Sequence, residues 1–544
     1  MNLLRILFPV CLILFLGSCK EPLPRPVIRI IPQPAEGTDK DGVFVINSAT
    51  KIGISNENEQ LRHIAGFLTS HLERYFGIAN LGITAYEFGV KQSVFLKLDP
   101  TLNLGKEDYH LSVLPDGVLI EAAAANGLFY GVQTLFQLMP PSPKQVGEII
   151  LPAVDIKDAP RFAWRGLMLD VSRHFMPKEY ILKFLDEMAM HKFNTFQWHL
   201  ADDQGWRIEI KKYPRLTEVG SVRTNTLRGH LANGYGIDTV SAAGYYSQND
   251  IREIVEYASD RYITIVPEIG IPGHALSALA AYPELGCNGV PYQVGGRWGM
   301  YSDVYCPGKE NTFIFLNDVF SEMAGLFPGK YFHIGGADCP VTRWDRCPDC
   351  ETRMKEDSIV STQALHNYFV GRVTKMIHSL GKEVVGWDEL LKDTSRTGGV
   401  IVAWHGEDYT ITSVRKKNLT VVSNGKYYNF DQYQGNPSTE PLAVGGLVTL
   451  EQIYNFDPIP KSLNNKESRY IMGIQGNIWT PYMKTPVYVD YMTFPRAAAL
   501  AEVAWTPKAN LNYKWFRKRL LVQIKRYEAE KITYSKAEFK TLTN

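Results

Sequence analysis

Tyr331-Phe-His-Ile-Gly-Gly-Ala-Asp338 is a short strand-like run that ends in two glycines and, one residue later, a carboxylate. In a barrel of parallel strands, the loops at the carboxyl ends of the strands build the ligand site. An acidic residue directly after such a run is therefore well placed to meet a ligand. The stretch predicts a barrel strand at Tyr331–Ile334 whose following loop presents Asp338.

The same order of strand, loop and helix is repeated along most of the chain after Pro160. Helical patterns between the strands include Lys178–His191, Asn249–Arg261 and Thr362–Leu380. Eight such units predict an α/β fold, a TIM (β/α)8 barrel preceded by a small α+β domain. The predicted strands are Gly166–Asp170, Thr195–His199, Thr264–Glu268, Tyr331–Ile334, Val384–Trp387, Val400–Trp404, Thr420–Val422 and Met472–Gln475.

Polar and aromatic side chains gather at or just after the predicted strand ends, where a barrel would place its site. These residues are Asp170, His199, Asp202, Glu268, His274, Asp338, Trp387, Asp388, Trp404 and Trp479.

Composition changes mark the domains. Residues 35–158 alternate short apolar runs with turns and two helical patterns, which predicts an α+β domain. We assign 159–510 to the barrel and 511–544 to a helical extension, in which Trp515–Ile532 is amphipathic and basic.

The beginning of the chain predicts export. Residues 1–18 contain one cation and an apolar run from Ile6 to Leu16, too short to cross a bilayer, as in a signal peptide. Leu16-Gly17-Ser18-Cys19 resembles a bacterial lipobox, which makes Cys19 the expected lipid-modified residue. The proline-rich residues 19–34 then form a tether. We expect a protein of the bacterial cell envelope, held at the membrane only through lipid.

The overall charge argues against a nucleic-acid partner. The 544 residues carry 58 Lys and Arg against 57 Asp and Glu, a formal net charge of +1, and the basic residues form no run. No cofactor is expected, and the sequence does not fix the oligomeric state.

Five cysteines lie beyond the leader and Cys19. We expect a disulfide between Cys287 and Cys306, which flank a loop rich in Gly and Tyr. Cys347-Pro-Asp-Cys350 together with Cys339 suggests zinc, but a closed site needs four ligands and no histidine has a suitable spacing. A disulfide or free thiols are therefore expected in place of a metal.

Several motifs resemble those of glycoside hydrolase family 20, the β-N-acetylhexosaminidases. The resemblance extends over nearly all of Val27–Pro507. It is carried by Trp164–Phe175, Trp198–Arg207, Pro272-Gly-His-Ala275, Tyr331–Asp338, Gly386–Glu389, Ala403-Trp404 and Asn477-Ile-Trp479.

The resemblance implies an exo-acting hydrolase that removes terminal β-linked N-acetylhexosamine from glycans, with the substrate's own acetamide as nucleophile. It implies catalytic roles for Asp338, His274 and Asp202, with His274 and Asp202 in one polar chain. A semi-buried Asp338 is expected to hold a raised pKa. The implied sugar-binding residues are Arg165, Trp387, Asp388, Trp404 and Trp479.

The sequence departs from the family pattern inside the sugar pocket. The Asp that polarises the acetamide is replaced by Ala337, and the acid Glu by Asp338, which is shorter by one methylene. The other replacements are Asn429 for Tyr, Gly270 for Asp and Pro481 for Glu.

Three interpretations remain open. The protein cleaves amino sugars with Asp338 as a displaced acid, or it cleaves a sugar that lacks the acetamide, using Asp338 with Asp388 or Glu389. Alternatively it is a sugar-binding lipoprotein without activity.

Overall fold

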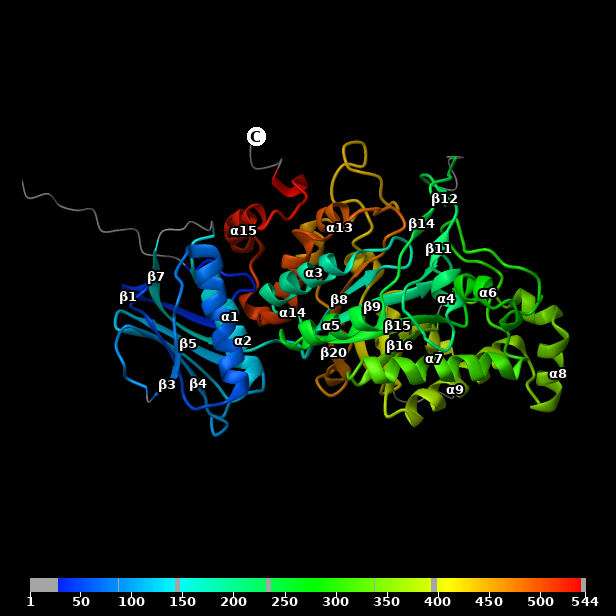
Figure 1. Ribbon diagram of the computed structural model, residues 1–544, viewed down its shortest axis with the longest axis horizontal. Coiled ribbons are helices and arrows are strands. Elements are labelled where there is room, and N and C mark those ends of the chain that lie inside the picture. The colour runs from blue at the N-terminus through cyan, green and yellow to red at the C-terminus, as the bar shows by residue number, and fades with distance from the viewer. Residues whose placement is uncertain are drawn as a thin grey trace, which may run out of the picture.

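A closed barrel of eight parallel strands forms the larger part of the protein, and a smaller sheet domain lies beside it (Figure 1). The computed structural model describes residues 28–86, 88–141, 147–230, 236–336, 338–392 and 399–539. The predicted leader, Cys19, most of the tether and Ala337 lie outside these residues. The arrangement confirms the predicted fold class.

The amino-terminal domain is a seven-stranded mixed sheet in the order β1-β7-β5-β6-β4-β2-β3. Its two helices lie between the sheet and the barrel (Figure 1). The first helix is capped by Asn58, whose side chain accepts the Gln60 and Leu61 N–H groups, and its apolar face is buried. The elements are β1 (Glu36–Asn47), β2 (Lys51–Ile54), α1 (Glu59–Phe76), β3 (Ile83–Ala85), β4 (Ser93–Leu98), β5 (Tyr109–Leu114), β6 (Gly117–Ala122), α2 (Ala125–Leu138) and β7 (Glu148–Asp158).

The barrel strands follow the predicted order and are all paired in parallel. The last strand closes on the first, with Gly473 opposite Trp164. The strands are β8 (Trp164–Asp170), β9 (Thr195–Asp202), β15 (Thr264–Ile271), β16 (Tyr331–Gly335), β17 (Glu383–Trp387), β18 (Val400–Ala403), β19 (Leu419–Val422) and β20 (Ile471–Ile478).

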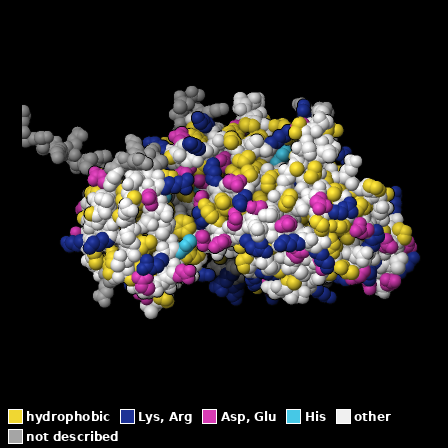
Figure 2. Space-filling view, viewed as in Figure 1, with side chains coloured by type: hydrophobic (Ala, Val, Ile, Leu, Met, Phe, Trp, Pro, Cys, Tyr) yellow, Lys and Arg dark blue, Asp and Glu magenta, His cyan; other side chains and the backbone are white. Residues whose placement is uncertain are grey.

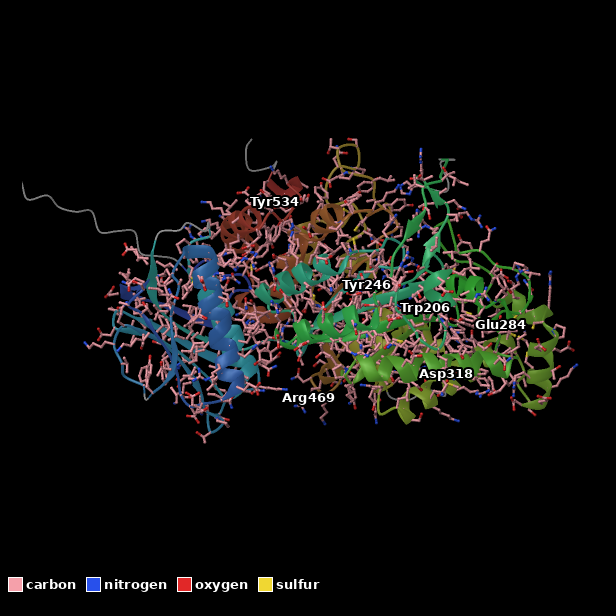
Figure 3. The ribbon with its side chains drawn as sticks, in the orientation of Figure 1. Trp206, Tyr246, Glu284, Asp318, Arg469 and Tyr534 are labelled. Carbon is pink, nitrogen blue, oxygen red and sulfur yellow. The ribbon has the colours of Figure 1, made fainter. Side chains whose placement is uncertain are left out.

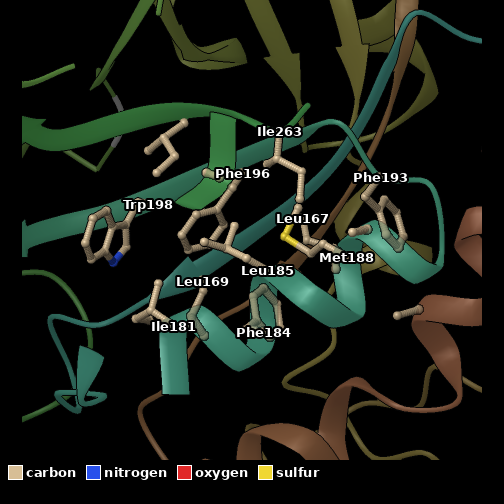
Figure 4. Close-up of a cluster of buried hydrophobic side chains, with 14 of the residues drawn as sticks. Leu167, Leu169, Ile181, Phe184, Leu185, Met188, Phe193, Phe196, Trp198 and Ile263 are labelled. Carbon is tan, nitrogen blue, oxygen red and sulfur yellow. The ribbon is translucent and has the colours of Figure 1, made fainter. Parts of the chain in front are cut away.

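Helices cover the outside of the barrel with apolar faces. Phe184 and Met188 of the helix after β8 pack against Leu167 and Phe196 of the first two strands (Figure 4). Each such burial contributes about 1.5–3 kcal/mol, which fixes the helix on the strands. The main helices are α3 (Lys178–Met190), α5 (Gln248–Ser259), α7 (Glu310–Leu326), α9 (Thr362–Ser379), α10 (Glu407–Arg415), α12 (Leu450–Asn455), α14 (Arg496–Trp505) and α15 (Tyr513–Ala529).

Short elements decorate the loops. Trp206 and Tyr246, labelled in Figure 3, are buried in the segment after β9, and the Tyr246 ring lies 4.7 Å from that of Trp198. These elements are β10 (Gly205–Trp206), α4 (Arg215–Glu218), β11 (Val222–Arg223), β12 (Thr226–Leu227), β13 (Ile237–Asp238), β14 (Ala242–Ala243), α6 (Leu276–Ala281), η2 (Pro283–Leu285), η3 (Val341–Arg346), α8 (Pro348–Glu356), η4 (Asp388–Lys392), α11 (Gly425–Tyr428), η5 (Ser468–Tyr470), α13 (Pro486–Thr493), η6 (Lys508–Asn510) and η7 (Ala537–Phe539).

Arg165 joins the two domains, so its predicted role in sugar binding is wrong. It lies near the amino end of β8, and its guanidinium forms two bonds with Glu107 of the first domain, at 2.8 and 2.9 Å. It also donates to the Lys192 carbonyl oxygen and lies over the Trp505 ring. The amino ends of barrel strands face away from the ligand side, which explains the error.

The predicted disulfide between Cys287 and Cys306 is also wrong. The five described cysteines beyond the leader are all free, and four of their thiols form one cluster.

The surface carries both signs of charge, interspersed over the face shown in Figure 2. Among the described residues, no helix combines the length and apolar character that a bilayer crossing requires.

Candidate active site

A cavity of about 200 Å³ opens at the carboxyl ends of the barrel strands. Its lining comes from nearly every strand end, as expected for a barrel site. The lining residues are Arg173, His199, Asp202, Glu268, Gly270, Ile271, His274, Gly335, Gly336, Asp338, Trp387, Glu389, Trp404, His405, Asp431, Trp479 and Pro481.

The loop after β16 brings Asp338 to the cavity. Gly336 has a φ of 83°, and a Cβ atom at this position would lie 2.4 Å from Leu390, so glycine is required for the turn. The Asp338 N–H then donates to Oε2 of Glu389 at 2.9 Å. Asp338 itself has a φ of 51°, a rare conformation that is concentrated at functional sites.

His274 connects Asp338 to two buried carboxylates. Its Nδ1 lies 3.0 Å from Asp202 and 3.1 Å from Asp203, and its Nε2 lies 3.6 Å from Asp338. The predicted contact between His274 and Asp202 is thus confirmed. Burial disfavours the imidazolium, but the charge of Asp202 and the hydrogen bonds outweigh it and raise the pKa of His274 well above its usual value.

Asp338 does not have the raised pKa that we expected. The hydrogen bond from His274 stabilises the carboxylate more than partial burial destabilises it, so the pKa of Asp338 is lowered. The side chain is 51% exposed, which limits the opposing effect of burial. Asp338 is therefore ionised at neutral pH.

Glu389 has the opposite environment. Its side chain is only 13% exposed. Burial, together with the nearby charge of Asp338, raises the pKa of Glu389 above its usual value. Two carboxyl groups of one cavity are thus driven apart in pKa, a pattern typical of acid and base pairs in hydrolases.

The three predicted tryptophans wall the cavity. Trp387 and Trp479 lie 5.7 Å apart between ring centres, and Trp387 donates its indole N–H to Glu268 at 3.1 Å. Trp404 is held by Asn429, which accepts its indole N–H at 3.0 Å. Flat rings fixed in this way offer apolar faces to a sugar.

Asp388 does not line the cavity, in contrast to its predicted role in binding. It is fully buried behind the wall, where Oδ2 accepts the N–H groups of Trp404 and His405 at 2.8 Å. Oδ1 lies 2.6 Å from Nδ1 of His405. Asp388 therefore positions Trp404 and leaves no oxygen for a sugar.

Arg173 is the arginine at the cavity, and it is not among the site residues predicted from the sequence. It follows the end of β8, and its guanidinium lies 2.8 Å from Asp202 and 3.3 Å from Asp170. Its charge also lies over the ring of Trp479, 5.1 Å from the centre. The rule that strand ends face the ligand would have favoured Arg173 over Arg165 within the same motif.

Asp431 is a second cavity residue that is not among those predicted from the sequence. It lines the cavity, and its Oδ1 is buried without a hydrogen-bond partner among the described residues. Burial raises the pKa of Asp431 to about 7. A buried acceptor that lacks a partner is costly unless a ligand supplies the donor.

The substituted positions differ in their effects. Asn429 supports Trp404 and also accepts from Asn477 at 3.1 Å, so it belongs to the wall. Gly270 and Pro481 line the cavity and offer no side-chain hydrogen bond. Ala337 lies outside the described residues.

Asp202, Asp203 and His274 have ligand atoms within 4.8 Å of one another, a spacing that also suits a metal ion. His274 and Arg173 already pair with these carboxylates and supply positive charge there. The charges of Asp202 and Asp203 are thus balanced by Arg173 and His274 without a metal ion.

Comparison with known families agrees with this geometry. Residues 162–508 match the model described as glycosyl hydrolase family 20, catalytic domain, and residues 27–159 match domain 2 of that family. A beta-hexosaminidase of Porphyromonas gingivalis is 42% identical over 94% of this chain and 66% of its own length. One from Vibrio furnissii is 32% identical over 87% of this chain and 76% of its own length.

Solved structures give the same result over both domains. The family 20 β-N-acetylhexosaminidase of Streptomyces coelicolor aligns with a TM-score of 0.82 at 30% identity, over 94% of this chain and 98% of its own. The N-acetyl-β-hexosaminidase of Streptomyces plicatus aligns with a TM-score of 0.81 at 31% identity, over 95% and 98%. Sequence, domain order and site thus agree, and the chain belongs to glycosyl hydrolase family 20.

Proposed function

We propose that the protein is an exo-acting glycoside hydrolase that removes a terminal β-linked N-acetylhexosamine from a glycan. The observation that carries this proposal is the cavity of about 200 Å³ at the carboxyl ends of the barrel strands. It is smaller than the roughly 300–1,000 Å³ of sites for drug-sized ligands, and suits one sugar unit. The similarity to named beta-hexosaminidases supports the same substrate class.

The polar residues of the cavity support binding of a single ring. Oδ1 of Asp431, which has no hydrogen-bond partner in the described part of the chain, would accept a hydrogen bond from a sugar hydroxyl. That bond would remove the cost of leaving a buried oxygen unpaired. Arg173 lies beside Trp479 and would donate to the hydroxyls of a ring stacked on the wall.

In this proposal Asp338 donates the proton to the leaving oxygen, because it is the carboxyl that the loop after β16 contributes to the cavity lining. A general acid must be protonated before it reacts, so the rate falls as pH rises through its pKa. Since the pKa of Asp338 is lowered, the enzyme should be most active in acid.

A second candidate function is favoured by the pair Asp338 and Glu389. Ala337 has no carboxylate to orient an acetamide, whereas these two carboxyl groups are separated in pKa. Glu389 would act as the protonated acid and Asp338 as the ionised nucleophile or base. The substrate would then be a sugar without the acetamide.

One experiment separates these functions. The purified protein is assayed from pH 3 to 8 on chromogenic β-N-acetylglucosaminide, β-N-acetylgalactosaminide, β-galactoside and β-glucoside, together with Asp338→Asn and Glu389→Gln. The first proposal predicts activity on the acetamido sugars that falls as pH rises, with a midpoint below the usual pKa range of carboxyl groups, and a loss of ~10²–10⁴-fold in Asp338→Asn.

The second candidate predicts activity on the β-galactoside or β-glucoside. This activity should fall with rising pH around a midpoint above the usual pKa of Glu, and Asp338→Asn and Glu389→Gln should lose similar amounts of it. Sugar binding by calorimetry without turnover on any substrate would contradict both, and would identify a binding protein.

We also propose that the protein is anchored in the bacterial cell envelope by lipid on Cys19. The apolar run before Leu16-Gly17-Ser18-Cys19 supports this location. Mass spectrometry of the mature amino terminus should find a lipid-modified cysteine, and Cys19→Ser should move the protein from the membrane to the soluble fraction. An unmodified Cys19 in the mature chain would contradict the proposal.

A further inference from the structure

Four cysteines from two separate loops meet at the end of the barrel farthest from the amino-terminal domain. Cys287 and Cys306 belong to the segment between α6 and α7, and Cys347 and Cys350 belong to the start of α8. Figure 1 shows α8 at this end, and Figure 3 places Glu284, which precedes Cys287, beside it.

The four sulfur atoms lie close enough together to bind one ion. All of them lie within 4.8 Å of one another. The sulfur of Cys306 is 3.6 Å from that of Cys350 and 3.7 Å from that of Cys347, and Cys287 is 3.9 Å from Cys350. Sulfur atoms that each lie about 2.3 Å from one zinc ion are separated by ~3.8 Å at the corners of a tetrahedron.

Disulfides do not account for this arrangement. A disulfide pairs each sulfur with a single partner at about 2.05 Å. Here Cys306 is in contact with both Cys347 and Cys350, and Cys350 is in contact with both Cys306 and Cys287. Shared contacts of this kind are expected when all four sulfur atoms face one centre.

The backbone brings two similar turns together at the cluster. Cys306-Pro-Gly308 lies against Cys347-Pro-Asp-Cys350, and a Cβ atom at Gly308 would lie only 2.2 Å from the Asp349 carbonyl carbon. Glycine is needed there because the two main chains touch. Such close approach supports a site built from both turns.

The surroundings are suited to a bound cation. Cys306, Cys347 and Cys350 are buried in a small apolar cluster with Trp344 and Leu365. Four thiolates in such a place would repel one another strongly without a positive ion. Cys347 is the N-cap residue of α8 and Cys350 lies in its first turn, where the helix dipole favours negative charge.

We propose that Cys287, Cys306, Cys347 and Cys350 bind one structural Zn²⁺ ion. Four sulfur ligands without an open position are typical of a structural zinc site. The ion would tie the loop after β15 to the loop after β16. These two loops also carry His274 and Asp338, so the ion fixes the outer ends of the segments whose inner ends meet in the cavity.

The test measures metal in the full-length protein, purified without added metal or chelator. Elemental analysis should find about one zinc per chain, and an organomercurial reagent that blocks thiols should release it in the same ratio. Cys306→Ser with Cys350→Ser should lose about nine-tenths or more of the zinc. Cys339→Ser is the matched control, because this thiol belongs to the same loop but not to the cluster.

A second measurement on the wild type covers the case in which the double variant does not fold. Removing the zinc should speed backbone hydrogen exchange in residues 286–309 and 339–356 by roughly tenfold or more, and added Zn²⁺ should restore protection. Four metal-free thiols, iron in place of zinc, disulfide-linked peptides among these cysteines, or zinc loss in Cys339→Ser alone would overturn the proposal. The proposal is independent of which glycoside the cavity accepts.

Discussion

Asp431 shows how a single residue exchanges stability for binding. Its carboxyl is buried with one oxygen lacking a partner among the described residues, and its pKa is raised to about 7. The folded protein therefore holds a proton there that the unfolded chain releases at a lower pH. Sugar binding would supply the missing donor, so the cost is present mainly in the empty cavity.

Replacing Asp431 by Asn should stabilise the empty protein at pH 8. A carboxyl whose pKa is raised on folding destabilises the folded state as pH rises from its unfolded value near 3.8 to its folded value near 7. The gain should be about 2–4 kcal/mol at pH 8 and vanish near pH 4. Thermal unfolding across this pH range measures it.

Asp388→Asn is the matched comparison, since this buried carboxylate is fully engaged by Trp404 and His405. It should destabilise the protein by about 1–3 kcal/mol. Equal stability of Asp431→Asn and the wild type at pH 8 would show that the ionised Asp431 carboxylate does not destabilise the folded protein.

Restoring the family residues should increase activity on acetamido sugars. Ala337→Asp combined with Asp338→Glu returns a group that can accept the amide N–H and lengthens the acid by one methylene. We expect kcat/KM on β-N-acetylglucosaminide to rise by ~10–10²-fold, a partial gain because Gly270, Asn429 and Pro481 stay altered. Ala337→Asn is the control without the charge, and an unchanged rate in the double variant would contradict this account of the pocket.

At the scale of elements, the end of β16 depends on the conformation of Gly336. Gly336→Ala adds a Cβ atom that contacts the Leu390 side chain, and the alanine must adopt a φ of 83°, which is unfavourable for any residue with a Cβ atom. Stability should fall by about 1–3 kcal/mol, measured by denaturant unfolding. Activity should fall as well, because the same turn aims Asp338.

Gly325 of α7 is the control for this prediction, because a Cβ atom there meets no atom of the described residues within 4 Å. Gly325→Ala should be neutral or stabilising by up to about 1 kcal/mol. If both substitutions have the same effect, the turn after β16 is not specially constrained.

The sequence predicts the positions of the barrel strands better than it predicts the orientation of single side chains. All eight barrel strands lie within a few residues of their predicted positions, because each is a short apolar run bounded by turns. The orientation of single side chains was harder to predict. Arg165 and Asp388 belong to the right motifs but face the domain junction and the back of the wall.

The cysteine cluster shows why the rest could not be predicted. The sequence does not indicate that Cys287 and Cys306 lie near Cys347 and Cys350, since the two pairs are separated along the chain by the whole of α7 and β16. Only the barrel brings their loops together. In the same way, the opposite pKa shifts of Asp338 and Glu389 arise from burial and contacts that no local pattern contains.

At the scale of the whole molecule, the junction between the domains contains buried charges. Arg165 pairs with Glu107, and Lys192 lies 2.9 Å from Asp158 with both side chains fully buried. Arg165→Met should leave the Glu107 carboxylate without its cationic partner and destabilise the protein by about 3–5 kcal/mol, with little change in sugar affinity. Calorimetry should then resolve separate unfolding of the two domains.

Lys355→Met is the control, because Lys355 forms an exposed pair with Glu351 on α8. It should change stability by less than about 0.5 kcal/mol. A large loss of sugar affinity in Arg165→Met would show that Arg165 contributes to sugar binding.

The pairing of β20 with β8 also determines when the barrel can be completed during synthesis. The amino-terminal sheet has all its strands once Asp158 has been made. In contrast, β8 can pair with β20, where Trp164 lies opposite Gly473, only after almost the whole barrel has been made. Until then the growing barrel has two open edges, which are prone to pair with other chains. Ribosome-bound chains that end before β20 should therefore contain a folded first domain and a second one that depends on chaperones.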